Sequence, residues 1–143
     1  MKKIILTLSL TALLAASAGA HCQIPCGIYD DSARITEMKE HVTTIEKSMK
    51  EITSLKPDSP QNSNQLVRWV NNKEAHADKL TEIVTAYFLT QRIKPGTEHY
   101  DAQLKTLHGM MIAAMKAKQT VDLEQVTKLR ALIAEFETLY HTH

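Results

Sequence analysis

The sequence has 143 residues, 43% of them hydrophobic, and its 17 Lys and Arg nearly balance its 16 Asp and Glu. This length suits one domain with a single core. The near-neutral charge and the absence of a glycine-rich phosphate loop give no reason to expect nucleic acid or an anionic membrane surface as a partner.

The first 20 residues have the pattern of a secretory signal peptide. Two lysines precede a mostly apolar run over residues 4–16, and the small residues Ala18-Gly19-Ala20 follow it. The run is too short for a transmembrane span, which needs about 20 apolar residues. Lipoprotein processing at Cys22 is an alternative, but His21 stands where that peptidase requires a small residue. We expect cleavage after Ala20, export to the periplasm or the medium, and no membrane attachment of the mature chain.

Cleavage would start the mature chain with nine residues rich in metal donors, His-Cys-Gln-Ile-Pro-Cys-Gly-Ile-Tyr. The freed amine of His21, the backbone nitrogen of Cys22 and the Cys22 sulfur are consecutive, so fused small chelate rings can hold one ion. Cys26 adds a second thiolate, and the His21 ring can approach from outside the plane. A planar donor set suits copper(II) or nickel(II) and disfavours tetrahedral zinc. The donors alone leave both metals open, and copper has the higher affinity in open competition.

A disulfide between Cys22 and Cys26 is the simplest alternative, because exported proteins commonly oxidise paired cysteines. This bond would close only a very small loop near the chain end, so it would restrain little of the unfolded chain. It also leaves the terminal His21 without a role. The position of the histidine therefore favours metal binding.

Residues 31–55 predict a first long helix, because apolar residues recur there at alternating steps of three and four. These residues are Ile35, Met38, Val42, Ile45, Met49 and Ile52. A polar connector over residues 56–63 contains Pro57 and Pro60 and predicts a loop. A second helix is expected from about Asn64 to Gln91. Its apolar stripe consists of Leu66, Val70, Ala77, Leu80, Val84 and Tyr87.

Two further helices complete the chain. After a break at Lys94-Pro95-Gly96, a third helix is expected to end near Gln119, and Asp122 suits the start of the fourth. Their inward residues are Leu104, Leu107, Met111 and Ala114, then Val126, Leu129, Ile133, Phe136 and Tyr140. Four helices of similar length favour an all-α, antiparallel four-helix bundle, because each narrow apolar stripe is stable only when neighbouring helices cover it.

The run His21-Cys22-x-x-Pro25-Cys26-Gly27-x-Tyr29-Asp30 resembles the amino-terminal nickel hook of nickel superoxide dismutases. The similarity in length and helix order covers nearly all of residues 21–143, although only the hook is specific. The resemblance implies a signal peptide over residues 1–20 and a dismutase domain over 21–143. Within that domain it implies an irregular hook at 21–29 and a bundle at about 31–142.

The resemblance implies conversion of superoxide to dioxygen and hydrogen peroxide, with one nickel ion per subunit cycling between the divalent and trivalent states. It implies ligation by His21 through its amine and, in the oxidised state, its ring. It also implies ligation by Cys22 through nitrogen and sulfur, and by Cys26 through sulfur. Thiolate ligands make chemical sense because electron-rich sulfur lowers the nickel(III)/nickel(II) reduction potential. Without them this potential would be too high for superoxide to be both oxidised and reduced. A homohexamer whose neighbouring subunits help enclose each hook is implied as well.

Three other positions resemble functional residues of the family. Tyr29 is similar to the gate tyrosine that restricts access to the metal. His76 resembles a position that holds an arginine or histidine beside the hook histidine, and Tyr87 resembles a second tyrosine beside the gate. From the residues alone, a bundle histidine and a core aromatic explain His76 and Tyr87 equally well. Gln23 stands where the family frequently has an aspartate, and Leu89 where it commonly has a lysine. The contacts of that carboxylate and the electrostatic steering by that lysine are therefore not carried over.

Two other functions remain open at this point. One is a periplasmic copper or nickel carrier that uses the same donors without turnover. The other is a disulfide-bonded helical module that binds a protein partner, which predicts no metal and two oxidised cysteines. An enzyme needs a gate, and Tyr29 after Gly27 favours the enzyme over the carrier. The sequence therefore predicts a nickel-dependent superoxide dismutase.

Overall fold

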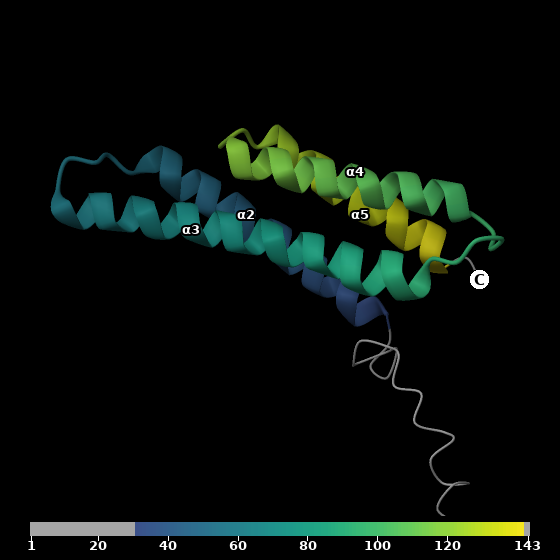
Figure 1. The fold of residues 1–143 in the computed structure, drawn as a ribbon. Helices are drawn as coiled ribbons and strands as arrows, with labels where there is room; N and C mark the ends of the chain where they lie inside the picture. The colour runs from purple at the N-terminus through teal and green to yellow at the C-terminus, as the bar shows by residue number, and fades with distance from the viewer. Residues whose placement is uncertain (1–30, 142–143) are drawn as a thin grey trace, which may run out of the picture.

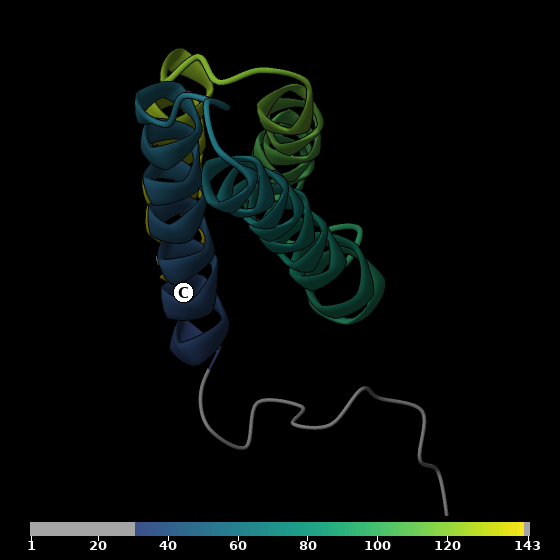
Figure 2. The ribbon, with the colours of Figure 1, turned by 90° about the vertical axis from the view of Figure 1, so that its left-hand side faces the viewer.

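The computed structural model describes residues 31–141, which form four long helical rods. The elements are α2 (Ser32–Ser54), α3 (Pro60–Glu82) with its continuation η2 (Ile83–Arg92), α4 (Tyr100–Gln119) and α5 (Glu124–His141). Successive rods run in opposite directions, and each packs against two others (Figures 1 and 2). The predicted antiparallel four-helix bundle is confirmed, and the hook lies outside the described residues. Within 31–141, no helix is long and apolar enough to span a membrane.

The connector between α2 and α3 is shorter than predicted. Ser59 caps α3, because its side-chain oxygen accepts the backbone N–H of Asn62 at 3.1 Å. Pro60 occupies the start of the helix, where its missing N–H costs nothing and its fixed φ suits helical backbone. The prediction of a loop over residues 60–63 is therefore wrong. At the start of α5, the Asp122 carboxylate accepts the N–H of Glu124 at 2.9 Å, as its expected role at a helix start requires.

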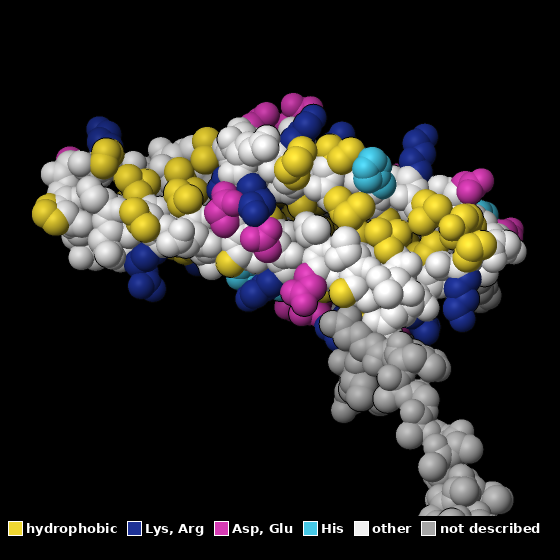
Figure 3. Space-filling model, viewed as in Figure 1, with side chains coloured by type: hydrophobic (Ala, Val, Ile, Leu, Met, Phe, Trp, Pro, Cys, Tyr) yellow, Lys and Arg dark blue, Asp and Glu magenta, His cyan; other side chains and the backbone are white. Residues whose placement is uncertain are grey.

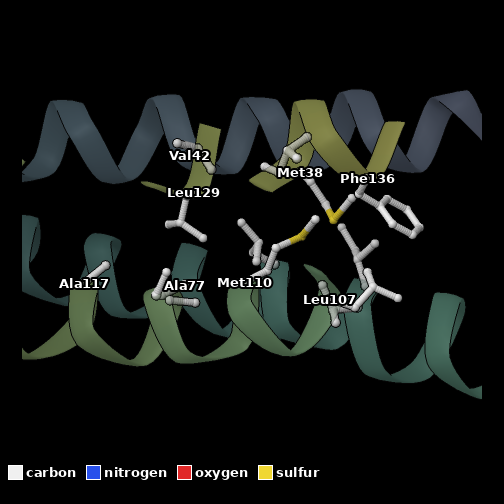
Figure 4. Packing of buried hydrophobic residues seen from close by; sticks show 14 of the residues in the cluster. Met38, Val42, Ala77, Leu107, Met110, Ala117, Leu129 and Phe136 are labelled. Atoms are coloured by element: carbon white, nitrogen blue, oxygen red, sulfur yellow. The ribbon is translucent and has the colours of Figure 1, made fainter. Parts of the chain in front are cut away.

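The predicted apolar stripes meet in one core. Figure 4 shows side chains from all four rods pointing toward one another, among them Met38, Ala77, Met110 and Phe136. The expectation fails for Val70, which is 40% exposed. The first part of α3 extends past the end of the α4–α5 pair (Figure 1), and Val70 precedes Lys73, which reaches the end of α4, by three residues.

A buried lysine joins α3 to the end of α4. The Lys73 ammonium group donates to the carbonyl oxygens of Ala117 at 2.9 Å and Thr120 at 3.0 Å, and also to that of Lys118. Carbonyls at a helix C-terminus have no partner within the helix and carry the negative end of its dipole. Burial lowers the pKa of Lys73. The three oxygens nevertheless give this buried group a full set of acceptors.

The last part of the second rod is a π-helix, which the sequence pattern did not predict. The N–H of Ile93 donates to the Phe88 carbonyl at 3.0 Å, five residues earlier, whereas an α-helix bonds four residues back. The wider turn brings residues five apart onto nearly the same face. Tyr87 and Arg92 have this spacing.

Candidate functional site

The predicted ligands His21, Cys22 and Cys26 and the predicted gate Tyr29 lie outside the described residues. The structure fixes the point at which they join the bundle, because Asp31 stands immediately before α2. Among residues 31–141, no group of three or more His, Cys, Asp or Glu side chains is arranged to hold a metal ion. The predicted ligands His21, Cys22 and Cys26 all precede residue 31 in the sequence.

A partly buried polar cluster formed by Asp31, Tyr87, Arg92 and Tyr140 lies at this junction. The Asp31 carboxylate accepts hydrogen bonds from the Tyr87 hydroxyl, from Nε of Arg92 at 2.9 Å and from the Tyr140 hydroxyl at 2.5 Å. Arg92 also donates to the carboxylate through Nη2, and its Nε lies 3.1 Å from the Tyr140 oxygen. The start of α2, the π-helix and the end of α5 are thus tied together by one carboxylate.

The protonation states within this cluster follow from its contacts. Burial acts to raise the pKa of Asp31, but hydrogen bonds from Tyr140, Tyr87 and Arg92 outweigh it and hold that pKa below its usual range. Burial and the neighbouring Asp31 raise the pKa of Tyr140 to about 12. Asp31 is therefore an anion at neutral pH, and Tyr140 keeps its proton and can donate it to that anion.

Tyr87, which the sequence placed beside the gate, belongs to this cluster. Its side chain is only 2% exposed, and its hydroxyl faces Asp31. The Arg34 guanidinium lies over its ring at 5.2 Å from the centroid, which is cation–π geometry. Tyr87 thus contacts Asp31, the residue that follows Tyr29 by two positions in the sequence. It does not describe the expected contact between the two tyrosines.

His76 pairs with a second histidine that sequence reasoning missed. Nδ1 of His76 on α3 lies 3.1 Å from Nδ1 of His41 on α2, and the two rings meet edge to face. His41 is 8% exposed, and its Nε2 has no hydrogen-bond partner among residues 31–141. Its position directly before the buried Val42 was a signal that it lies at the edge of the α2 seam. One ring must donate and the other accept, so the pair cannot be fully protonated without losing this bond.

A shallow cleft of about 310 Å³ connects the two groups. Its lining includes Arg34, Glu37 and His41 from α2, and Lys79, Glu82 and Tyr87 from the second rod. Nε2 of His41 lies 4.0 Å from a carboxylate oxygen of Glu37 in the same cleft. The cleft thus places His41 and Glu37 side by side in the first half of α2.

The histidine pair predicts a loss of stability on mild acidification. Burial lowers the pKa of both His41 and His76, so below about pH 6.5 the unfolded chain binds more protons than the folded chain. The free energy of unfolding should therefore fall between pH 7.5 and pH 5.5. Urea unfolding at the two pH values measures this change. A double variant, His41→Gln with His76→Gln, should show a smaller fall, and an equal fall would show that other groups cause it.

The sequence model for nickel-containing superoxide dismutases matches residues 16–143, a range that contains the nine hook residues and the whole described bundle. Comparison with curated proteins and with solved structures gives no match.

Proposed function

The chain belongs to the nickel-containing superoxide dismutase family, and on this premise we propose that its nickel is bound at an amino terminus created by cleavage after Ala20. Its activity is the conversion of superoxide to dioxygen and hydrogen peroxide, with nickel as the cofactor. The match over residues 16–143 is the observation that carries this function. Neither the carrier nor the disulfide module receives comparable support.

The ligands are proposed to be His21, Cys22 and Cys26. Their donors fit nickel, because consecutive amine, amide and thiolate groups form a planar set and thiolates stabilise its higher oxidation state. Nickel, when bound, supplies one-electron chemistry, accepting an electron from one superoxide and donating one to another. The free amine of His21 exists only after cleavage, so this ligand set depends on processing.

The bundle is proposed to support the hook through the cleft at the start of α2. Cys26 lies five residues before Asp31, so extended chain places it at most about 18 Å from that residue. Nδ1 of His76 already faces His41, which leaves Nε2 of His76 as the nitrogen available to the His21 ring. Tyr29 is proposed to restrict access to the metal, as the gate tyrosine does in the family.

Export and assembly into a homohexamer complete the proposal. The signal-peptide pattern of residues 1–20 supports an exported, periplasmic or secreted protein. Apolar side chains gather along the face of α3 and α4 in Figure 3, and Val67 and Met115 are 60% and 50% exposed. Such side chains suit burial between subunits. Mass measurement of the native protein in solution tests the hexamer directly.

The function is tested by purifying the chain with His21 as its first residue and supplying nickel. We expect one nickel ion per subunit, the paramagnetic spectrum of trivalent nickel in the oxidised protein, and removal of superoxide. Copper supplied alone should not give this activity. A chain that binds no nickel, or binds it without removing superoxide, would contradict the proposal.

A further inference from the structure

Asp31 does not do what an aspartate at its position ordinarily does. It occupies the N-cap position of α2, where a side-chain oxygen normally accepts a backbone N–H of the first turn. Here the side chain makes no such bond. Its backbone carbonyl accepts the N–H of Arg34 at 3.0 Å, while its carboxylate turns inward and is 8% exposed. The Asp31 side chain therefore does not stabilise the first turn of α2, and it contacts η2 and α5 instead.

The π-helix makes two of these contacts possible. Tyr87 and Arg92 are five residues apart, a spacing that an α-helix would direct to different faces. Bonds to the carbonyl five residues back recur through this segment, from the side chains of Thr90 at 2.7 Å and Gln91 at 2.9 Å. The widened turn directs both side chains to one carboxylate. Extended π-helices are rare and are associated with functional sites.

Aromatic packing fixes the third donor. The Tyr140 ring stacks on Phe136 at 5.3 Å between centroids and meets Phe88 edge to face at 5.4 Å. Phe88 and Phe136 are completely buried. The core therefore holds the Tyr140 hydroxyl in place beside Asp31.

We propose that Asp31, held by Tyr87, Arg92 and Tyr140, is a positioning residue that fixes the base of the metal-binding hook on the bundle. This inference rests on the proposed ligation by the hook. Tyr29 precedes Asp31 by two residues, so the chain allows at most about 7 Å between their Cα atoms. Anchoring the carboxylate limits where Tyr29 and the more distant Cys26 can lie. Asp31 acts through the chain and touches neither metal nor substrate.

The test compares nickel release from the loaded wild-type protein and from Asp31→Asn, which keeps the side-chain shape but removes the charge that pairs with Arg92. Excess chelator is added and free nickel is followed over time. Release should accelerate roughly tenfold, the effect typical of losing a residue that orients metal ligands. The trivalent-nickel spectrum should broaden as the ligands occupy more arrangements. Far-UV circular dichroism at the same temperature reports whether the helices are intact.

Two further variants separate anchoring from general stability. Lys39→Met removes an exposed ion pair with Glu137, at 2.6 Å, between the same helices α2 and α5, and should leave release and spectrum unchanged. Tyr140→Phe removes one bond to Asp31 but keeps the aromatic packing, so it should give an intermediate rate. If Asp31→Asn does not fold, Tyr140→Phe decides the question.

The outcomes distinguish this inference from the proposed function. A wild-type protein that never binds nickel contradicts the proposed function. A wild-type protein that binds nickel, together with Asp31→Asn and Tyr140→Phe variants that match its release rate and spectrum, overturns the positioning role. Equal acceleration in Lys39→Met would also overturn it, because the effect would then follow from any weakening between α2 and α5.

Discussion

Replacing either Cys22 or Cys26 with serine is expected to abolish nickel binding and superoxide removal. A serine hydroxyl stays protonated at neutral pH and is a poor donor to a metal that prefers thiolate. Either change also removes sulfur that lowers the nickel potential into the range where superoxide is both oxidised and reduced. Metal analysis should find less than about a tenth of the wild-type nickel, in line with the affinity losses that follow disruption of a metal site.

The helical body provides the control for this experiment. The core within residues 31–141 packs without either cysteine, so the far-UV circular dichroism of both variants should match the wild type. The thiols of the loaded wild-type protein should resist alkylation until nickel is removed, whereas a disulfide would resist it with or without metal. Full activity in either serine variant would exclude the thiolate site.

Replacing Lys73 with methionine is expected to cause a large loss of stability. The change leaves the carbonyl oxygens of Ala117, Lys118 and Thr120 without their charged donor at the partly buried end of α4. A buried carbonyl oxygen left without its donor costs about 1–3 kcal/mol, because the oxygen stays desolvated and unpaired. Urea unfolding of the metal-free chain should show a decrease of about 1–3 kcal/mol in the free energy of unfolding.

Lys50→Met is the matched control for this variant. Lys50 pairs with Glu46 at 2.6 Å, but its side chain is 60% exposed. Exposed ion pairs contribute little, so this change should cost less than about 0.5 kcal/mol. A Lys73 variant that is no less stable than the Lys50 variant would show that water can replace Lys73 as the hydrogen-bond donor to the carbonyl oxygens at the end of α4.

The sequence predicted the rods well and their local departures poorly. Periodic apolar residues such as Ile35 and Met38 locate a buried helix face, because that period depends only on helical geometry. The prediction of a loop at Pro60 is wrong, because proline is equally suited to the first turn of a helix. Val70 fits the apolar stripe but is exposed, because the stripe does not reveal where the neighbouring helices end.

The surroundings of the hook could be predicted only in part. A local motif predicts His21, Cys22 and Cys26 as ligands, because fused chelation requires neighbours in sequence. The histidine pair and the Asp31 cluster instead join residues far apart in the chain, such as Asp31 and Tyr140. Their partners are selected by packing and by the π-helical turn. The α-helical spacing of apolar residues gives no sign of that turn.

The central claim is that proteolysis creates a metal ligand, the free amine of His21. It is tested most directly by measuring the nickel content and trivalent-nickel spectrum of two otherwise identical proteins, one starting at His21 and one retaining Ala20. We predict one nickel ion per subunit and the trivalent signal in the first protein, and neither in the second. Equal nickel content and identical spectra, with mass spectrometry confirming that Ala20 is still present, would contradict the claim.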